Sequence, residues 1–346
     1  MKATYHKHIL DFKRPSGTSR GILKQKETWF IHLTDGEKQG IGECGILRSL
    51  SIDDVPNYEE KLRWACENIH LGKDALLKEL RTFPSIQFGV EQAFLSLGAE
   101  TPFLLHPSKF TQGKEAIDIN GLIWMGEADF MKSQIKDKLE AGFSCIKMKI
   151  GAIDFETELE LLHSIRNEYS VHDIELRVDV NGAFTPSTAL EKLQRLAEFE
   201  LHSIEQPIKQ GQHEEMAKLC EITPLPIALD EELIGIFDRE NKKKILETIQ
   251  PQYIILKPSL VGGYTGSSEW ISLAKKQNID WWITSALESN IGLNAIAQWT
   301  YTLQSKLPQG LGTGSLYTNN FDSPLTIEKG ALQYDRAKSW NVPFNL

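Results

Sequence analysis

Short apolar runs alternate with longer amphipathic segments over most of this chain, from about residue 116 onward. The short runs predict β-strands, and the segments between them have the periodicity of helices that bury one face. We expect strands at residues 116–124, 144–150, 174–180, 203–205, 226–230, 253–257 and 281–285, with a weaker one near 310–314. We expect helices between them, for example at residues 127–141, 155–168, 186–200 and 263–276.

Strands that alternate with helices at this period predict a parallel sheet, because each helix returns the chain to the start of the next strand. Eight such units favour closure into a (β/α)8-type barrel, a modified TIM barrel of the α/β class. An open, doubly wound sheet is the structural alternative. It would normally carry a glycine-rich phosphate loop after its first strand, and Gly121-Leu122-Ile123-Trp124 is not such a loop.

The N-terminal region has a different pattern, which predicts an α+β domain. Residues 28–33 and 39–44 predict two strands joined by a hairpin turn at Asp35-Gly36. From about residue 55 to 99 the pattern becomes helical, and Ser85 is the expected N-cap of one helix. We expect this domain at residues 1–110 and the barrel at residues 111–320. The last segment, 321–346, loses the barrel rhythm and is expected to return to the N-terminal domain.

Composition excludes several classes of protein. A length of 346 residues fits a barrel plus a second domain, and the net charge of −9 argues against binding of nucleic acid. No apolar run is long enough for a membrane helix, and the first residues lack the apolar stretch of a signal peptide. The four cysteines are scattered, which favours reduced thiols in a cytoplasmic protein. Nothing in the sequence indicates an oligomeric state.

Five ionisable residues recur at intervals of 25 to 30 residues along the barrel region: Lys149, Asp179, Glu205, Asp230 and Lys257. One strand, one crossover helix and two short loops need about that many residues. Each of the five is therefore expected at the C-terminal end of a successive strand. In a barrel, those ends form the face on which chemistry takes place.

Three of the five are carboxylates, and their convergence predicts a metal site. A single acid after a strand is more often a helix N-cap than a ligand. Acids that end three neighbouring strands, however, converge and repel one another unless a cation lies among them. Ligation by oxygen alone favours Mg²⁺ over zinc. None of the nine histidines ends a predicted strand, so the sequence lacks the histidine-rich site of a hydrolytic zinc barrel.

Lys149 and Lys257 flank these acids in strand order and are candidate bases. Lys147 and Lys149 lie two apart on one predicted strand, so both side chains point into the barrel; on an exposed edge strand they would be solvated instead. A free lysine has a pKa near 10.4, and a neighbouring cation can lower that pKa enough to make the amine a usable base. A divalent cation beside a lysine base favours removal of a proton from the carbon next to a carboxylate.

Two further segments are candidates for substrate contact. Residues 284–290 join the seventh strand to a helix, and free N–H groups there could hold a carboxylate; an ordinary capped helix start is the alternative. Residues 15–21 are the best candidate for a mobile lid over the site. Arg20 in that lid could meet an anionic substrate, although a solvated arginine is the simpler interpretation.

The combined motifs resemble the enolase superfamily over about residues 116–316. The motifs are Lys147-Met148-Lys149, Asp179-Val180-Asn181, Glu205-Gln206-Pro207, Leu229-Asp230-Glu231 and Leu256-Lys257-Pro258, and Gly42-Glu43 resembles the capping domain of that superfamily. The resemblance implies that Lys149 and Lys257 form an acid/base pair and that Asp179, Glu205 and Asp230 bind one Mg²⁺. It also implies that Lys147, Asn181 and Ser285 lie near a small carboxylate substrate.

A lysine on both sides of the acids resembles the muconate-lactonising subgroup, and residues 257–263 and 285–292 look like segments of the o-succinylbenzoate synthases. Those enzymes dehydrate 2-succinyl-6-hydroxy-2,4-cyclohexadiene-1-carboxylate through an enediolate in the menaquinone pathway. Racemases of N-acylamino acids, dipeptide epimerases and cycloisomerases are the alternatives within the fold. Dipeptide epimerases usually carry Asp-x-Asp after the eighth strand, where this chain has Gly312-Thr313-Gly314. A barrel that only binds a ligand is the alternative from another class.

Overall fold

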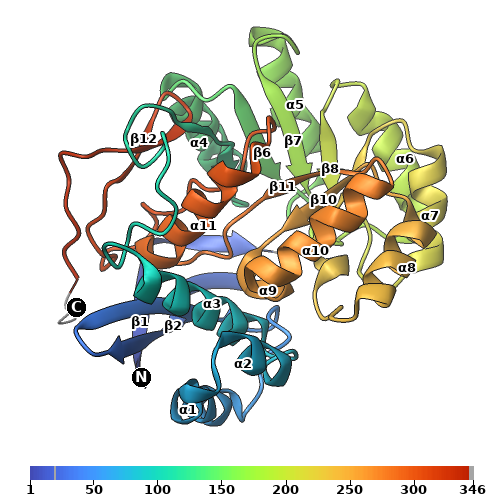
Figure 1. Cartoon of the computed structure of the whole chain (residues 1–346). Helices are drawn as coiled ribbons and strands as arrows, with labels where there is room; N and C mark the ends of the chain where they lie inside the picture. The colour runs from blue at the N-terminus through green and yellow to red at the C-terminus, as the bar shows by residue number, and fades with distance from the viewer. Residues whose placement is uncertain (19–20, 343–346) are drawn as a thin grey trace.

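The computed structural model describes residues 1–18 and 21–342, and it begins with an antiparallel sheet (Figure 1). Three strands lie in the order β1 (Lys2–Thr18), β2 (Gly21–Asp35) and β3 (Lys38–Gly45). The predicted hairpin turn is confirmed, because β2 ends at Asp35 and Gly36 has a φ of 62°. That positive φ is one that glycine adopts without a steric cost.

Three α-helices cover one face of this sheet and complete the N-terminal domain: α1 (Tyr58–Glu67), α2 (Lys73–Glu79) and α3 (Pro84–Gly98), with a short 3₁₀ turn η1 (Ile69–Leu71) between the first two. Helix α3 packs so closely on β3 that a Cβ atom on Gly42 would lie 1.8 Å from the carbonyl oxygen of Gly89. The expected N-cap was wrong. Phe83 occupies that position, and Ser85 lies in the first turn, where its N–H and hydroxyl donate to Asp53 Oδ2 at 2.9 and 2.6 Å.

Seven strands form the parallel sheet that the alternating pattern predicts. Their order, β11-β10-β9-β8-β7-β6-β5, follows the chain, so each strand lies beside the next one in sequence. The strands are β5 (Gly121–Ile123), β6 (Cys145–Lys149), β7 (Glu175–Asp179), β8 (Ser203–Glu205), β9 (Ile227–Leu229), β10 (Tyr253–Leu256) and β11 (Asp280–Ile283).

The predicted eighth strand was wrong as a regular element: residues 310–314, all of which the structure describes, form no strand. Instead, Gln309 and Gly310 form isolated bridges, Gln309 with Ile119, which lies two residues before β5, and Gly310 with Thr284, which directly follows β11. Gln309 N donates to the carbonyl of Asp118 at 2.8 Å, and Gly310 N donates to the carbonyl of Ile283 at 2.8 Å. A Cβ atom on Gly310 would lie 2.3 Å from Thr284 Oγ1, so glycine permits this close approach. These two residues thus connect the segments beside the first and last strands of the sheet, where a regular eighth strand was expected.

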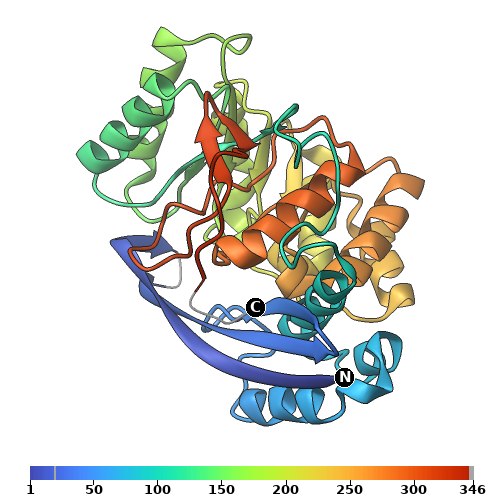
Figure 2. The same cartoon turned by 60° about the vertical axis from the view of Figure 1, so that its left-hand side comes forward.

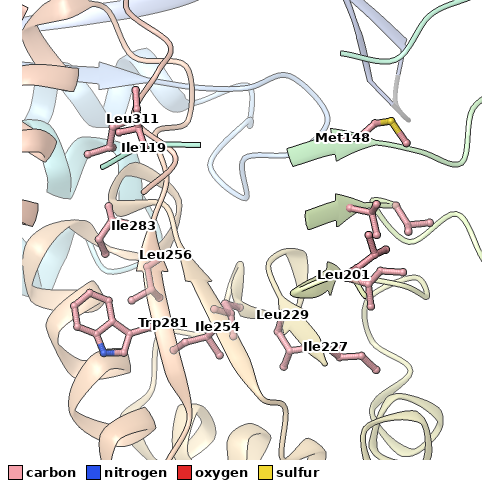
Figure 3. Close-up of a cluster of buried hydrophobic side chains, with 14 of the residues drawn as sticks. Ile119, Met148, Leu201, Ile227, Leu229, Ile254, Leu256, Trp281, Ile283 and Leu311 are labelled. Atoms are coloured by element: carbon pink, nitrogen blue, oxygen red, sulfur yellow. The ribbon is translucent and has the colours of Figure 1, made fainter. Parts of the chain in front are cut away.

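The helices of the barrel are α4 (Ala128–Glu140), α5 (Phe155–Glu168), α6 (Pro186–Ala197), α7 (His213–Ile222), α8 (Arg239–Ile249), α9 (Pro258–Val261), α10 (Gly263–Lys276) and α11 (Asn290–Leu303), with a 3₁₀ turn η2 (Glu231–Leu233) after β9. The strands are buried on both faces. Ile254 and Leu256 belong to the main core cluster (Figure 3), whereas Ile255 belongs to a separate cluster with Ala228 and Trp282. Burial on both faces explains why each strand is a nearly continuous apolar run.

The C-terminal segment contributes to two places. The hairpin β12 (Leu325–Glu328) and β13 (Ala331–Tyr334) adds to the short strand β4 (Ile117–Asp118), in the order β12-β13-β4. The single strand expected at residues 116–124 is therefore split between two sheets, β4 and β5. Outside the hairpin, Phe321 packs edge-on against Phe30 of β2, with ring centroids 5.3 Å apart. In Figure 2 the C-terminal segment, drawn in red, runs from the barrel toward the N-terminal sheet, drawn in blue.

Candidate active site

The ends of neighbouring strands place the predicted charged residues side by side. Lys149 ends β6 and is the Cα partner of Asp179, which ends β7. Asp179 is in turn the Cα partner of Glu205, which ends β8. Asp230 directly follows β9, and Lys257 directly follows β10. The five residues therefore lie in strand order around one mouth of the barrel.

A buried network joins the first strands of this set. Lys147 Nζ lies 2.5 Å from Glu205 Oε2 and 3.0 Å from Asp179 Oδ2. Lys149 Nζ donates to Asp179 Oδ2 and to Asn181 Oδ1, both at 2.8 Å. Asp179 thus forms ion pairs with both lysines, because their side chains point to the same face of β6. The alternative of a solvated lysine pair on an edge strand is excluded by this burial.

The remaining predicted groups extend the network around the mouth. Lys257 Nζ donates to Asp230 Oδ2. Asn181 Nδ2 donates to Glu231 Oε1 at 3.0 Å, which ties β7 to the turn after β9. On the other side, the hydroxyl groups of Ser285 and Thr313 lie 2.6 Å apart.

Burial and charge set the protonation of these groups. Burial raises the pKa of Asp179, but the ammonium groups of Lys147 and Lys149 lower it by more, so this pKa lies well below its usual range. Burial and the neighbouring Asp179 carboxylate raise the pKa of Glu205 to about 8, although Lys147 acts in the opposite direction. The lysines of the site therefore do not fully compensate the negative charge of its buried carboxylates.

The pKa of Lys257 is also set by burial and by neighbouring charges, which act in opposite directions. Burial lowers the pKa of Lys257, but the carboxylates of Asp230, Glu205 and Glu231 together raise it by more, so the net shift is upward. The charges of the protein itself hold Lys257 protonated. If a lysine of this site is to act as a base, its pKa has to be lowered by additional positive charge among these carboxylates.

The donor set fits a divalent cation in its chemistry, although it is not a preformed cage. Within residues 1–18 and 21–342, no three carboxylate, imidazole or thiolate groups are arranged closely enough to hold a metal ion. The carboxylates of Asp179, Glu205 and Asp230 instead contact lysines. Glu205 Oε1, however, is buried with no hydrogen-bond partner. An orphaned buried oxygen in a carboxylate with a raised pKa is what a hard cation with oxygen ligands would satisfy.

A cavity of about 290 Å³ lies over these groups. Lys147, Lys149, Asp179, Asn181 and Lys257 line its polar end. Apolar side chains also line the cavity, partly from the N-terminal domain and partly from the barrel: Ile22, Leu23, Leu47, Leu50, Trp124 and Leu316. The cavity thus suits a small molecule with an anionic end and an apolar body.

Comparison with known proteins identifies the fold family. The family described as enolase C-terminal domain-like matches residues 131–338, which is more than half of the chain. The chain belongs to the enolase superfamily. The family of MenC N-terminal domains matches residues 5–97, which include the antiparallel sheet apart from the first residues of β1, and almost all of α3. The resemblance that the sequence motifs indicated is therefore confirmed.

Individual members of the superfamily are similar over nearly the whole chain. The o-succinylbenzoate synthase of Desulfotalea psychrophila is 45% identical, covering 96% of this chain and 98% of that protein. The crystal structure of MenC from the same organism has a TM-score of 0.86 and 42% identity over 96% of this chain and 99% of that chain. A substrate-liganded L-Ala-D/L-Glu epimerase from Bacillus subtilis has a TM-score of 0.81 at 18% identity over 96% of both chains, which shows a shared fold alone.

The structure brings most residues of the predicted site together at the cavity. Ser285 lines the cavity along with the lysines, Asp179 and Asn181, whereas Glu205 and Asp230 lie against the lysines. Arg20 lies outside the described residues. Sequence reasoning did not single out Glu231 and Thr313, which also line the cavity. Their signals were weak: Glu231 only follows Asp230, and Thr313 lies in the segment taken for an eighth strand.

Proposed function

We propose that this superfamily member is an o-succinylbenzoate synthase, a carbon–oxygen lyase that dehydrates 2-succinyl-6-hydroxy-2,4-cyclohexadiene-1-carboxylate in menaquinone biosynthesis. The observation that carries the proposal is the 45% identity to an o-succinylbenzoate synthase over 96% of this chain and 98% of that protein. The match to MenC N-terminal domains supports it, because that domain supplies apolar side chains to the cavity.

The residues that line the cavity suit the chemistry of such a substrate. The polar end of the cavity, at the strand ends, suits the ring carboxylate, and its apolar side suits the carbon ring and the methylene groups of the succinyl chain. In this pose the carbon that bears the ring carboxylate lies near Lys149. The ring carboxylate itself faces the region of Asp179, Glu205 and Asp230.

Lys149 performs both proton transfers in this proposal. Its neutral amine takes the proton from the ring carbon that bears the carboxylate, and the electron pair of that C–H bond is delocalised onto the carboxylate as an enediolate. That pair then forms a double bond of the ring as the hydroxyl group leaves. The bond between the neighbouring carbon and its hydroxyl group then breaks, and the Lys149 ammonium returns the proton to the leaving oxygen, so that water departs. The product is aromatic, and the amine is regenerated. Asn181, whose Oδ1 accepts from Lys149 Nζ at 2.8 Å, orients the amine.

Lys257 acts as a fixed positive charge on the opposite side. The carboxylates around it, together with the net upward shift of its pKa, keep it protonated. A protonated lysine cannot accept a proton, but it stabilises negative charge that develops on the substrate. Lys147, held between Asp179 and Glu205, is proposed to complete the positive side of the pocket.

Mg²⁺ bound by Asp179, Glu205 and Asp230 would supply the positive charge that stabilises the substrate carboxylate while the neighbouring carbon loses its proton. The raised pKa of Glu205 and its unpartnered Oε1 support this ligand set, since a cation there would favour the ionised form of Glu205.

The test is a direct assay of dehydration. The purified chain is mixed with the cyclohexadiene carboxylate, and formation of the aromatic product is followed by ultraviolet absorbance in Mg²⁺ and after chelation with EDTA. We expect turnover in Mg²⁺ and its loss in EDTA. A chain that forms no aromatic product in Mg²⁺ would overturn the proposal.

Racemisation of N-acylamino acids is tested in parallel, because two opposed lysines also suit exchange of an α-proton. Incorporation of deuterium from D₂O into N-succinyl amino acids and dipeptides without any aromatic product would favour racemase or epimerase activity. The cytoplasmic location stays a prediction from the sequence. No helix within residues 1–18 and 21–342 is both long and apolar enough to cross a membrane.

A further inference from the structure

Glu43 of strand β3 is a buried carboxylate that the proposed reaction does not use. It is fully buried, and both of its oxygens accept hydrogen bonds from residues of the barrel. Ser289 N donates to Oε1 at 2.9 Å, Ser289 Oγ donates to Oε2 at 2.5 Å, and Gly292 N donates to Oε2 at 2.8 Å. Thr28 of the neighbouring strand β2 adds a fourth bond, to Oε1 at 2.9 Å. Glu43 thus caps the N-terminus of α11 from another domain.

The segment that Glu43 holds leads directly into the cavity. Residues 284–289, here called the β11–α11 loop, connect β11 to α11, and the first four of them line the cavity. Leu287 in this loop has a φ of 60°, a left-handed conformation that a leucine rarely adopts. Such a conformation persists only where the surroundings determine it. Here those surroundings are the hydrogen bond from Tyr317 Oη to the Leu287 carbonyl at 2.6 Å and the anchor at Ser289.

The groups around Glu43 pack closely against it. A Cβ atom on Gly292 would lie 2.7 Å from Glu43 Oε2, so a glycine at that position lets the carboxylate reach the helix end. The backbone N–H of Glu43 donates to Gln92 Oε1 at 3.0 Å, and Gln92 Nε2 donates to the Ile291 carbonyl at 3.2 Å. Through Gln92, helix α3 therefore also supports the contact between Glu43 and the start of α11.

We infer that Glu43 is a positioning residue through which the N-terminal domain holds the β11–α11 loop, and with it Ser285 and the loop backbone, in the conformation that binds substrate. The inference rests on the proposed function only in taking the cavity as the substrate site. It predicts that substrate affinity depends on a side chain outside the cavity lining.

Glu91 provides a matched control within the same chain. It is also a buried carboxylate of the N-terminal domain, on α3, and it caps the start of another barrel helix, α10. Its Oε1 accepts from Thr265 N at 3.1 Å, and its Oε2 accepts from Tyr264 N. The segment that Glu91 holds contributes no residue to the cavity. Loss of either carboxylate should weaken the contact between domains, but only Glu43 should affect ligand binding.

The experiment compares Glu43→Gln with Glu91→Gln. Glutamine keeps the size of the side chain but replaces one accepting oxygen with a donor, so the bond from one backbone N–H group is lost in each variant. We measure binding of o-succinylbenzoate by calorimetry in Mg²⁺, the KM and kcat, the thermal midpoint, and amide hydrogen exchange of residues 284–289. For Glu43→Gln we expect the Kd and KM to rise about tenfold, with kcat changed less than about threefold, and the loop amides to exchange faster.

For Glu91→Gln we expect a comparable loss in thermal midpoint with the Kd and the exchange of residues 284–289 unchanged. If both variants lose stability while the Kd, KM and loop exchange stay at wild-type values, Glu43 has a structural role alone and the inference fails. If Glu43→Gln does not fold, Thr28→Val, which removes the bond from Thr28 Oγ1 to Glu43 and leaves the side chains of the loop unchanged, is judged by the same three readouts.

Failure of the proposed function is distinguishable from failure of this inference. A wild-type chain that neither dehydrates the cyclohexadiene carboxylate nor binds o-succinylbenzoate refutes the proposed function. The loop exchange of the two variants still decides the role of Glu43, because that measurement requires no ligand.

Discussion

Lys147 and Glu205 lie 58 residues apart in sequence, yet Lys147 Nζ donates to Glu205 Oε2 at 2.5 Å in the interior of the barrel. The first residue is on β6 and the second on β8, so the bond passes across the inner face of β7. On that face Lys147 Nζ also lies 3.0 Å from Asp179 Oδ2. One ammonium group thus links the carboxylates of two neighbouring strands.

Replacing Lys147 by methionine should destabilise the chain in metal-free buffer. The substitution keeps the length of the side chain but leaves Asp179 and Glu205 without their shared cation, and breaking a buried ion pair typically costs about 3 kcal/mol or more. Urea denaturation in EDTA measures the change in the free energy of unfolding. Lys218→Met is the control, since Lys218 is exposed and forms its ion pair with the nearby Glu215 on the surface of α7; its urea midpoint should stay at the wild-type value. An unchanged midpoint for Lys147→Met would contradict the network.

The two candidate bases should respond differently to arginine. Lys149→Ala and Lys149→Arg should both lower kcat by about 10³-fold or more with an unchanged circular dichroism spectrum, because neither side chain can accept a proton at neutral pH. Lys257→Arg should retain measurable turnover, since its proposed role needs only a positive charge. The assay is formation of aromatic product. Wild-type-like turnover in Lys149→Ala would assign the base to another residue.

Asp230→Asn should raise the Mg²⁺ concentration for half-maximal activity by about tenfold or more, because a neutral amide oxygen is a weaker ligand than a carboxylate. Activity is titrated against Mg²⁺ in both proteins. Asp238→Asn serves as the control, since Asp238 caps α8 on the surface, where it pairs with Arg81. An identical titration for Asp230→Asn and wild type would remove Asp230 from the ligand set.

Asp53 should make the stability of the N-terminal domain depend on pH. Burial raises its pKa from 3.8 to about 6, although hydrogen bonds from Ser85 oppose this. The folded chain therefore binds the proton more tightly than the unfolded chain. The stability contributed by protonated Asp53 is fully present below pH 3.8 and is lost as the pH rises to about 6.

Asp53→Asn should remove this dependence. The amide oxygen of asparagine can accept both bonds from Ser85 without a charge, so the variant should be more stable than wild type above pH 7, by at most about 3 kcal/mol. The two proteins should differ little at pH 4. Urea denaturation across this pH range provides the measurement, and a difference that does not grow with pH would contradict the assignment.

Much of the barrel was predictable because its strands and helices have short-range signatures. Helices α5 and α10 match the predicted ranges 155–168 and 263–276, and β8 matches 203–205. Burial of the strands on both faces produces continuous apolar runs, and burial of one helix face produces a 3.6-residue period. Both signals are local, so they need no knowledge of the fold.

The misassigned elements are those whose structure depends on distant partners. Gln309 and Gly310 replace a regular eighth strand because they bond to the strand edges near Asp118 and Ile283, which lie far away in sequence. Ser85 lies within the first turn of α3 because Asp53, 32 residues earlier, accepts its N–H and hydroxyl. A local pattern contains no information about such bonds.

The sequence by itself determined the alternation of strands and helices, the residues that end the strands, and the motifs that place the chain in the enolase superfamily. These features follow from periodicity and spacing along one chain. Only the tertiary structure decided which lysine meets which carboxylate, which apolar side chains of the N-terminal domain border the cavity, and that Glu43 caps α11 from 246 residues away. The physical reason is that hydrogen bonds and burial depend on distances in space, which are fixed only when the two domains pack together.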